Sequence, residues 1–384
     1  MKILNFLRQV KNLFEDPEGR LLRIEIDSRN LLHNISQFHQ KFPEHQLAAV
    51  LKSNAYGHGL KEIGSFLDNV DDIAYFAVDS LMEAQLLRQM GARKKIIVLG
   101  YVAEKSLGAI RKLKNIILVA NSLAQAEILK NRINFPLEVH LKIDTGMHRH
   151  GLAILELELA IKKLSENKKI KINGLMTHLA AANNPEEKNI SAQLGEWSVA
   201  VKIFEKYFPK GVLHFAATAG TRYLDKAKSN LIRLGIGLYG HENRDDNAIM
   251  GLKPVLSLYA KIVNIREISA GDGVGYNFLF KADKNLRIAV IPCGYYEAVP
   301  KALSNIGFVY YKNTPLRLLG RTSMNLSIID ISSVKEPLRL ETEIEVISND
   351  PDKLNSAENY AKIAKMAPYE IYVHLAPTIK RYIV

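Results

Sequence analysis

The chain has 384 residues, 47% of them hydrophobic and 24% charged, which is an ordinary globular mixture. These fractions exclude a largely disordered chain, a collagen-like repeat and a disulfide scaffold, and the length predicts two or three domains. The formal net charge of +12 comes from basic residues that are mixed with acidic ones along the whole chain. This distribution favours a solvated mixed surface over a nucleic-acid-binding site.

The first 20 residues carry hydrophobic side chains at helical spacing, with basic residues between them. The segment lacks the long apolar core and the cleavage site of a signal peptide. We interpret residues 1–20 as an amphipathic N-terminal extension that packs against the protein or against a second subunit. A helix that lies on a membrane surface is the alternative.

Between about residues 23 and 240, short apolar runs alternate with longer amphipathic stretches. Most runs are rich in Val, Ile and Leu without polar alternation, which is typical of strands buried on both faces of a parallel sheet. The runs are 47–51, 73–78, 96–99, 116–120, 137–143, 172–176, 212–216 and 231–236, and helices are expected at 80–90, 123–132, 152–164 and 187–207. Eight β-then-α units predict a closed (β/α)₈ barrel over residues 21–245. A doubly wound open sheet is the alternative, but no GxGxxG turn opens its first crossover.

After residue 245 the pattern changes to β-rich runs separated by Pro and Gly. The runs are 255–268, 286–292, 306–311, 327–331 and 344–347, and one helix is expected at 356–365. We therefore expect a second, mostly β domain over residues 246–384.

The single cysteine, Cys293, cannot form an internal disulfide, which indicates a reducing compartment such as the cytoplasm. No stretch approaches 18 consecutive apolar residues, so we expect no transmembrane segment.

A (β/α)₈ barrel places its active site at the carboxyl ends of its strands, so the residue after each run is a candidate. Lys52 follows the first run and precedes a glycine-rich turn. A lysine at this position would lie in a largely desolvated mouth, where its amine becomes a usable nucleophile. On position alone, a lysine that extends from the strand end into solvent is the other interpretation.

The segment Ala49–Gly59 (AVLKSNAYGHG) resembles the cofactor-lysine motif of the alanine racemases, fold-type III enzymes that use pyridoxal 5'-phosphate. In that family a (β/α)₈ barrel precedes a β domain, and the resemblance extends from about Arg23 to Tyr369. It implies an isomerase that interconverts L- and D-alanine and supplies D-alanine for peptidoglycan. It also implies a cytoplasmic homodimer with shared active sites and no metal.

The resemblance implies two acid–bases, since racemisation removes a proton from one face of Cα and returns one to the other. Lys52 would hold the cofactor covalently and act as the first. Tyr276, in the turn Gly271–Asn277 (GDGVGYN), would be the second and would reach into the barrel of the partner subunit. By itself, a tyrosine in a glycine-rich turn indicates only a hairpin.

The resemblance also assigns the other contacts with the cofactor and the substrate. The phosphate would be bound near the last strands by Tyr56, Thr218, Gly235, Ile236 and Tyr369, the two glycine-loop residues acting through their backbone amides. Met324 and Tyr295 would line the substrate pocket and its entry from the second subunit.

Arg149 lies in the second family-like motif, Lys142–Gly151 (KIDTGMHRHG), and would contact the cofactor's phenolic oxygen and the substrate carboxylate. Lys142 matches a position that is carbamylated in some members, where it orients this arginine; an ordinary ion-paired lysine is the alternative. His178, after the sixth run, would lie beside the cofactor ring, whereas its position alone also fits a barrel-core histidine.

Arg233 lies in the eighth run, at the start of the segment Arg233–Gly240 (RLGIGLYG), and the resemblance implies that it faces the pyridine nitrogen of the cofactor. Many pyridoxal enzymes place a carboxylate there, which keeps the nitrogen protonated and the ring a strong electron sink. An arginine is always charged and only donates hydrogen bonds, so it would keep this nitrogen unprotonated. Quick return of the proton to Cα is then favoured over side reactions.

Several positions depart from the family pattern, and they are expected to affect turnover and substrate range rather than the type of reaction. They are Asn183, Ala217, Leu234, Asn325 and the segment Tyr296–Ala298, in which Glu297 stands within a replaced Ala-Asp-Gly; Asn325 stands where aspartate is usual. Three other functions stay open: a racemase of broad range acting on larger amino acids, a non-catalytic pyridoxal-phosphate-binding protein, and a decarboxylase with a similar barrel.

Overall fold

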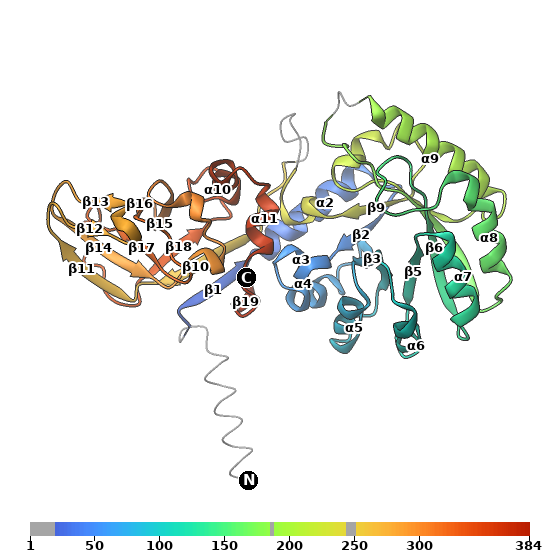
Figure 1. The fold of residues 1–384 in the computed structure, drawn as a ribbon, viewed down its shortest axis with the longest axis horizontal. Helices are drawn as coiled ribbons and strands as arrows, with labels where there is room; N and C mark the ends of the chain where they lie inside the picture. Colours follow the sequence, from blue (N-terminus) through green and yellow to red (C-terminus); the bar gives the residue numbers. More distant parts are fainter. Residues whose placement is uncertain (1–19, 185–187, 243–250) are drawn as a thin grey trace, which may run out of the picture. The chain divides into compact units, whose positions relative to one another are not determined.

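The computed structural model of the protein describes residues 20–184, 188–242 and 251–384 (Figure 1). The chain divides into two compact units. The barrel unit is Arg29–Leu252, and the β unit joins the described residues up to Ser28 to Lys253–Val384. The predicted N-terminal helix and the predicted boundary at residue 245 lie outside the described residues.

The described part of the barrel unit contains eight parallel strands in the order β8-β7-β6-β5-β4-β3-β2-β9. They are β2 (Gln46–Val50), β3 (Ile73–Val78), β4 (Lys95–Val98), β5 (Ile116–Ala120), β6 (Leu137–Lys142), β7 (Ile170–Met176), β8 (Val212–His214) and β9 (Leu231–Leu234). Each overlaps one of the predicted apolar runs, so the (β/α)₈ prediction is confirmed. The ring closes between β8 and β9, where the Arg233 N–H donates to the Ala216 carbonyl at 3.0 Å.

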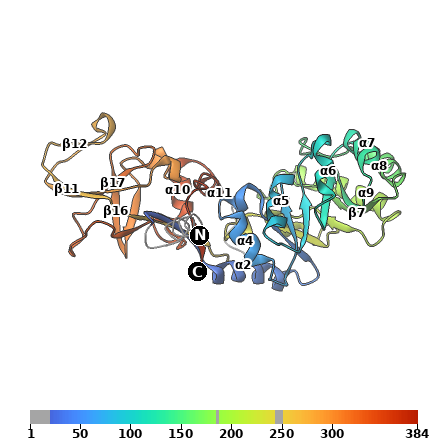
Figure 2. The same ribbon diagram turned by 90° about the horizontal axis from the view of Figure 1, so that it is seen from below.

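One helix precedes the first barrel strand and the others follow strands, and the longer ones lie outside the ring (Figures 1 and 2). They are α2 (Ser28–Lys41), α3 (Lys52–Tyr56), α4 (Leu60–Leu67), α5 (Leu81–Gln89), α6 (Leu107–Ile110), α7 (Leu123–Arg132), α8 (Leu157–Ser165) and α9 (Asn189–Glu205). Ser80 starts α5 with a capping box: its hydroxyl accepts from the Glu83 N–H at 3.2 Å, and the Glu83 carboxylate accepts from the Ser80 N–H at 3.0 Å.

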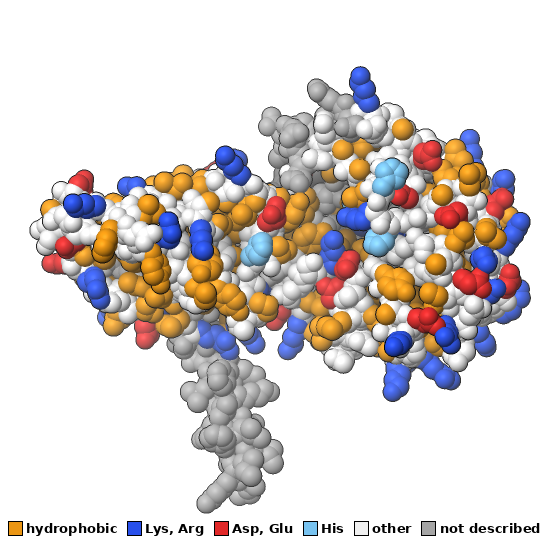
Figure 3. Space-filling model, viewed as in Figure 1, with side chains coloured by type: hydrophobic (Ala, Val, Ile, Leu, Met, Phe, Trp, Pro, Cys, Tyr) orange, Lys and Arg blue, Asp and Glu red, His pale blue; other side chains and the backbone are white. Residues whose placement is uncertain are grey.

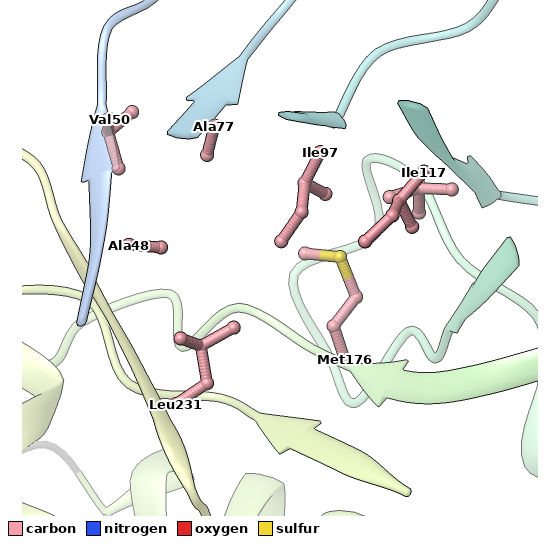
Figure 4. Close-up of a cluster of buried hydrophobic side chains, with 8 residues drawn as sticks. Ala48, Val50, Ala77, Ile97, Ile117, Met176 and Leu231 are labelled. Atoms are coloured by element: carbon pink, nitrogen blue, oxygen red, sulfur yellow. The ribbon is translucent and has the colours of Figure 1, made fainter. Parts of the chain in front are cut away.

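The interior of the barrel contains a cluster of apolar side chains. The buried cluster consists of Ala48, Val50, Ala77, Ile97, Ile117, Val119, Met176 and Leu231, and Figure 4 shows the labelled side chains pointing toward one another from their strands. Residues two apart on a strand share a face, so Glu138, His140 and Lys142 on β6 lie on one face of that strand. With His214 on β8 and Arg233 on β9, the last two of these residues are buried polar groups beside the apolar cluster.

The described part of the β unit contains a nine-stranded sheet in the order β11-β14-β17-β16-β15-β18-β10-β1-β19, and a short hairpin, β12-β13. The strands are β1 (Leu22–Ile26), β10 (Leu256–Lys261), β11 (Asn264–Ile268), β12 (Gly273–Val274), β13 (Phe280–Lys281), β14 (Leu286–Ile291), β15 (Phe308–Tyr311), β16 (Thr314–Leu319), β17 (Ser327–Asp330), β18 (Glu343–Ile347) and β19 (Arg381–Ile383). Two helices, α10 (Ala357–Ala364) and α11 (Pro368–Val373), complete it.

One stretch lies in a different unit from the one expected. Residues 21–28 were expected to begin the barrel, but β1 pairs antiparallel with β10 and parallel with β19, both in the β unit. The strand has the apolar pattern of either unit, and its backbone hydrogen bonds place it in the β unit.

The surface agrees with the mixed charge of the sequence. On the face shown in Figure 3, basic and acidic side chains are interspersed on each unit. Among the described residues, no helix combines the length and the apolar character needed to cross a membrane.

Candidate active site

A pocket of about 400 Å³ opens at the carboxyl ends of the barrel strands. Its lining is Val50, Lys52, Tyr56, Asp79, Leu99, Gly100, Tyr101, Lys142, Arg149, His150, Met176, His178, Ala217, Arg233 and Gly235. The structure thus brings together most of the barrel residues that the sequence singled out as functional.

Lys52 is held at the pocket by an unusual turn. It directly follows the end of β2, and the next four residues, Ser53–Tyr56, have left-handed backbone with φ between 52° and 56°. This conformation costs about 1–2 kcal/mol per residue for L-amino acids, so other contacts must hold it. The Ser53 N–H donates to the Glu83 carboxylate at 2.6 Å, and the Asn54 side-chain oxygen accepts from the Leu60 N–H at 2.8 Å. Glu83, which completes the capping box of α5, therefore also stabilises the turn after Lys52.

The ring of Tyr239 packs against the same turn and against the end of β2. The Tyr239 hydroxyl donates to the Val50 carbonyl at 2.9 Å, and its ring stacks on His58 with centroids 4.2 Å apart. The Tyr56 ring lies 5.4 Å from the Tyr239 ring. Tyr239 therefore contacts both the end of β2 and the ring of Tyr56.

A cradle for an anion lies beside Tyr56. A Cβ atom on Gly235 would lie 3.0 Å from the Tyr56 hydroxyl oxygen, so the absence of a side chain there keeps this space open. The Thr218 hydroxyl is buried and accepts from the Gly237 N–H at 3.0 Å, within the turn η4 that Ile236 begins. Hydroxyl groups and the start of a helical turn form the donor set that a phosphate requires.

Arg149 lies in a loop that a single carboxylate organises. One oxygen of Asp144 accepts from the N–H groups of Gly146, Met147 and His148, each at 3.0 Å. The Arg149 side chain is exposed and lines the pocket. The guanidinium is therefore free to meet a ligand.

Lys142 ends β6 and is 8% exposed. Burial, and next the positive charges of Arg149 and Arg233, lower the pKa of its amine from 10.5 to about 8. The carboxylates of Asp144 and Asp79 act in the opposite direction but do not offset this. A substantial fraction of Lys142 is therefore neutral near physiological pH.

Arg233 is buried and its guanidinium is fixed by several acceptors. Nη1 donates to the carbonyl and to Nδ1 of His214, at 2.6 Å and 2.9 Å. Nη2 donates to the carbonyls of Thr177 and Phe215 and, at 3.3 Å, to Nδ1 of His178. Burial lowers the pKa of Arg233 to about 10, which leaves it charged at neutral pH.

A chain of two histidines continues from Arg233 into the barrel. Nε2 of His214 lies 2.9 Å from Nδ1 of His140. Arginine only donates, so Nδ1 of His214 is an acceptor and its proton sits on Nε2, which donates to His140. Burial lowers the pKa of both rings, that of His140 to about 3, so both are neutral.

His178 is a second histidine that contacts Arg233. Burial, and next the charge of Arg233, lower its pKa to about 3, so the ring is neutral. Because Nδ1 accepts from Arg233, the ring proton is on Nε2. His178 can therefore act as a hydrogen-bond donor within the pocket.

Four residues with proposed roles lie in the β unit. Tyr276 stands at the tip of the β12-β13 hairpin and is 66% exposed. Tyr369 is in α11, and Met324 and Tyr295 lie on two loops that meet: the Tyr295 N–H donates to the Ser323 carbonyl at 3.0 Å. The structure thus places Met324 and Tyr295 on adjacent loops.

Sequence reasoning missed four residues around the pocket: Asp79, Glu83, His140 and His214. Asp79 directly follows β3, and His140 and Lys142 are polar residues two apart in one apolar run, so a signal was present for these. The contacts of Glu83 and His214 had no such signal.

The pocket fits the cofactor that the resemblance implies. The cationic side chains Lys52, Lys142, Arg149 and Arg233 line it, against the single carboxylate of Asp79 among its described lining residues. This charge balance, with the cradle at Gly235, suits an anionic phosphate ester. Within the described ranges, no group of three or more His, Cys, Asp or Glu side chains could hold a metal ion.

Comparison with known proteins agrees with the geometry. Two family models match the chain: "Alanine racemase, N-terminal domain" over residues 26–243 and "Alanine racemase, C-terminal domain" over residues 255–383. The chain belongs to the alanine racemase family.

Individual alanine racemases resemble the chain over almost its full length. That of Borreliella burgdorferi (strain ZS7) is 29% identical over 371 residues, covering 93% of this chain and 96% of the relative. That of Syntrophobacter fumaroxidans is 30% identical over 353 residues, with 91% and 94% covered.

Solved racemase structures superpose on the chain. The alanine racemase of Clostridium difficile 630 has a TM-score of 0.87 at 24% identity, covering 95% of this chain and 96% of that one, which supports the fold. That of Bartonella henselae, solved with covalently bound pyridoxal phosphate, has a TM-score of 0.81 at 26% identity, with 95% and 100% covered. The prediction of a (β/α)₈ barrel followed by a β-rich domain is therefore confirmed for this family member.

Proposed function

We propose that the protein interconverts L- and D-alanine with pyridoxal 5'-phosphate and a two-base mechanism. The observation that carries this proposal is the single pocket that joins Lys52, Arg149 and the buried Arg233. We further propose that it acts as a homodimer in the cytoplasm and supplies D-alanine for peptidoglycan.

When bound, pyridoxal phosphate supplies an electron sink that acidifies the Cα–H of an attached amino acid. Lys52 would hold the cofactor and then move a proton at one face of Cα through its Nζ amine. Tyr56, Thr218 and the backbone of Gly235 and Ile236 would bind the phosphate, and Tyr369 would add a hydroxyl donor. His178 would donate a hydrogen bond beside the ring.

Arg233 would keep the pyridine nitrogen unprotonated. Its guanidinium stays charged at neutral pH and donates only, and its other donors are already satisfied by fixed acceptors. The neutral histidines behind it accept or relay hydrogen bonds without adding charge. Because arginine stays protonated, it would donate a hydrogen bond to the pyridine nitrogen without giving it a proton.

Arg149 would orient the substrate through a bidentate contact with its carboxylate. Lys142 would support that arginine after carbamylation, in which its neutral amine adds to carbon dioxide and releases a proton. With a pKa of about 8, about a quarter of the amine is neutral at pH 7.5, against about a thousandth for an ordinary lysine. Carbon-13 bicarbonate should therefore give a protein carbamate NMR signal that Lys142→Met loses; its absence in both proteins would contradict the assignment.

Tyr276 would supply the second base from the partner subunit, and its exposed position at a hairpin tip supports this. A mixture of inactive variants tests both the base and the shared site. Lys52→Ala and Tyr276→Phe subunits, co-refolded or exchanged, should regain about a quarter of the wild-type activity, because random pairing makes half heterodimers with one intact site each. No recovery from two inactive homodimers that demonstrably exchange subunits would overturn the shared site.

The overall proposal is tested by racemisation of L-alanine with and without added cofactor. The wild-type protein should absorb in the visible or near-ultraviolet range of a bound pyridoxal group, and Lys52→Ala should lose both absorbance and turnover. Exposed Lys169 provides the matched control as Lys169→Ala. A wild-type protein that binds cofactor and leaves alanine unchanged would instead be a non-catalytic binding protein, and release of carbon dioxide would indicate a decarboxylase.

A second candidate is racemisation of larger amino acids with cationic side chains. Asp79 favours it, because its exposed carboxylate lines the pocket after β3. An exposed charge of this kind is worth at most about 1 kcal/mol, so Asp79→Asn should lower kcat/KM for lysine or ornithine about two- to fivefold relative to alanine. An unchanged ratio would leave alanine as the preferred assignment.

A further inference from the structure

Two loops of the β unit lie next to each other, at the end of β14 and the start of β17. One follows β14 and contains Tyr295, and the other precedes β17 and contains Met324. The strands are antiparallel neighbours with Ile291 opposite Ser327, so the end of one and the start of the other coincide. The relative placement of Tyr295 and Met324 is therefore decided by the contacts between these loops.

The loop backbones are joined closely. The N–H groups of Tyr295 and Tyr296 donate to the carbonyls of Ser323 and Met324, at 3.0 Å and 2.9 Å. A Cβ atom on Gly294 would lie only 2.3 Å from the Ser323 carbonyl oxygen, so glycine is required for this approach. The two loops thus form one small unit of structure.

Glu297 connects the side chains of the same loops. It is 5% exposed, and one carboxylate oxygen accepts from the Gly294 N–H at 2.9 Å. The other oxygen accepts from the Asn325 side-chain amide at 2.7 Å. Within the described chain no basic side chain forms an ion pair with Glu297, so hydrogen bonds alone compensate its burial.

We propose that Glu297 and Asn325 form a positioning pair that sets where Tyr295 and Met324 lie for substrate binding. The inference rests on the proposed function, in which these two side chains line the substrate pocket. The two side chains are chemically complementary. Two facing carboxylates would repel each other, whereas one carboxylate and one amide form a hydrogen bond.

The chemistry of the pair defines four variants. Glu297→Ala removes both hydrogen bonds and leaves the Gly294 N–H unpaired. Glu297→Gln keeps them, because its oxygen accepts from Gly294 and its amide donates to a flipped Asn325. Asn325→Asp sets two carboxylates against each other, and the double variant Glu297→Gln/Asn325→Asp restores a hydrogen bond of reversed direction.

The experiment is steady-state racemisation by the cofactor-loaded enzyme with L-alanine over a wide concentration range. Glu297→Ala and Asn325→Asp should raise KM at least about fivefold and change kcat less than about twofold. Glu297→Gln should keep KM near the wild-type value. The double variant should return KM to that value from the raised value of Asn325→Asp. In Asn325→Asp, KM should fall as the pH is lowered from 8.5 to 6, because two close carboxylates then share a proton. Exposed Glu267 supplies the control as Glu267→Ala.

Three outcomes would overturn the inference. One is an active Glu297→Ala enzyme with wild-type KM. The second is a loss in the double variant as large as in Asn325→Asp. The third is a fall in kcat and Tm together without a change in KM, which would make the pair merely structural. A wild-type enzyme without racemase activity would overturn the proposed function, and with it any role of the pair in substrate binding.

Discussion

Lys142 brings a positive charge into a buried place, and its replacement by methionine should stabilise the protein at neutral pH. In the cofactor-free protein, burial and the charges of Arg149 and Arg233 lower the pKa of its amine from 10.5 to about 8. At about 1.4 kcal/mol per pKa unit, the protonated lysine lowers the free energy of unfolding by about 3 kcal/mol at pH 7. Methionine has a similar length and no charge, so Lys142→Met should recover up to this amount and lose racemase activity.

The pH dependence of stability has a definite sign. The folded pKa lies below the unfolded one, so between pH 8 and pH 10.5 the unfolded chain binds more protons at Lys142 than the native protein. Wild-type stability should therefore rise across this window relative to Lys142→Met, by at most about 1.4 kcal/mol per pH unit. Bicarbonate, by forming the carbamate, should change the wild-type protein and not the variant.

Urea unfolding provides the assay, because Trp197 is the single tryptophan and is fully buried. Unfolding is followed by its fluorescence at pH 7 and at pH 10, with the exposed Lys169→Met as the control. A Lys142→Met protein that is less stable than wild type at pH 7 would refute the reasoning. So would an identical pH dependence in the two proteins.

Three further changes have expected outcomes. Ala298 has a left-handed backbone with φ 69°, so Ala298→Gly should raise the free energy of unfolding by about 1 kcal/mol, measured by denaturant titration against wild type. Gly151 has φ 142° and its Cβ would lie 2.3 Å from the Asp144 nitrogen, so Gly151→Ala should lower stability by about 3 kcal/mol or more, and a neutral result in thermal unfolding would contradict this geometry. His214→Phe leaves His140 without its partner and Arg233 without one acceptor, so it should cost about 2–3 kcal/mol and lower kcat; equal kcat in a stopped assay would show that Arg233 needs no such support.

The barrel strands were predictable because of where they lie. A strand covered on both faces is apolar at every position, so β3 and β5 read as unbroken runs of Val, Ile, Leu, Ala and aromatic residues. The strand β16 alternates exposed and buried residues and carries Pro315, and it was not predicted. The assignment of β1 to the β unit depended on partners more than 200 residues away.

The candidate site followed the same division. Lys52 could be found from the sequence because it follows the end of an apolar run. Arg149 and Arg233 could be found because they lie in segments that resemble motifs of the family, and barrel geometry gathers all three at one rim. Their supports could not be found in this way. Glu83 stabilises the lysine turn from the next helix, and His214 accepts from Arg233 across neighbouring strands.

The local pattern of the chain was therefore enough to predict the fold class, the ends of the strands and the residues able to take part in catalysis. Burial and periodicity are visible within a few residues of sequence. Tertiary structure alone decided the charge state of Lys142, the fixed orientation of Arg233 and the pairing of Glu297 with Asn325. These properties come from desolvation and from hydrogen bonds of a few ångströms between segments far apart in sequence. These contacts form only in the folded protein, where the strands bring the segments together.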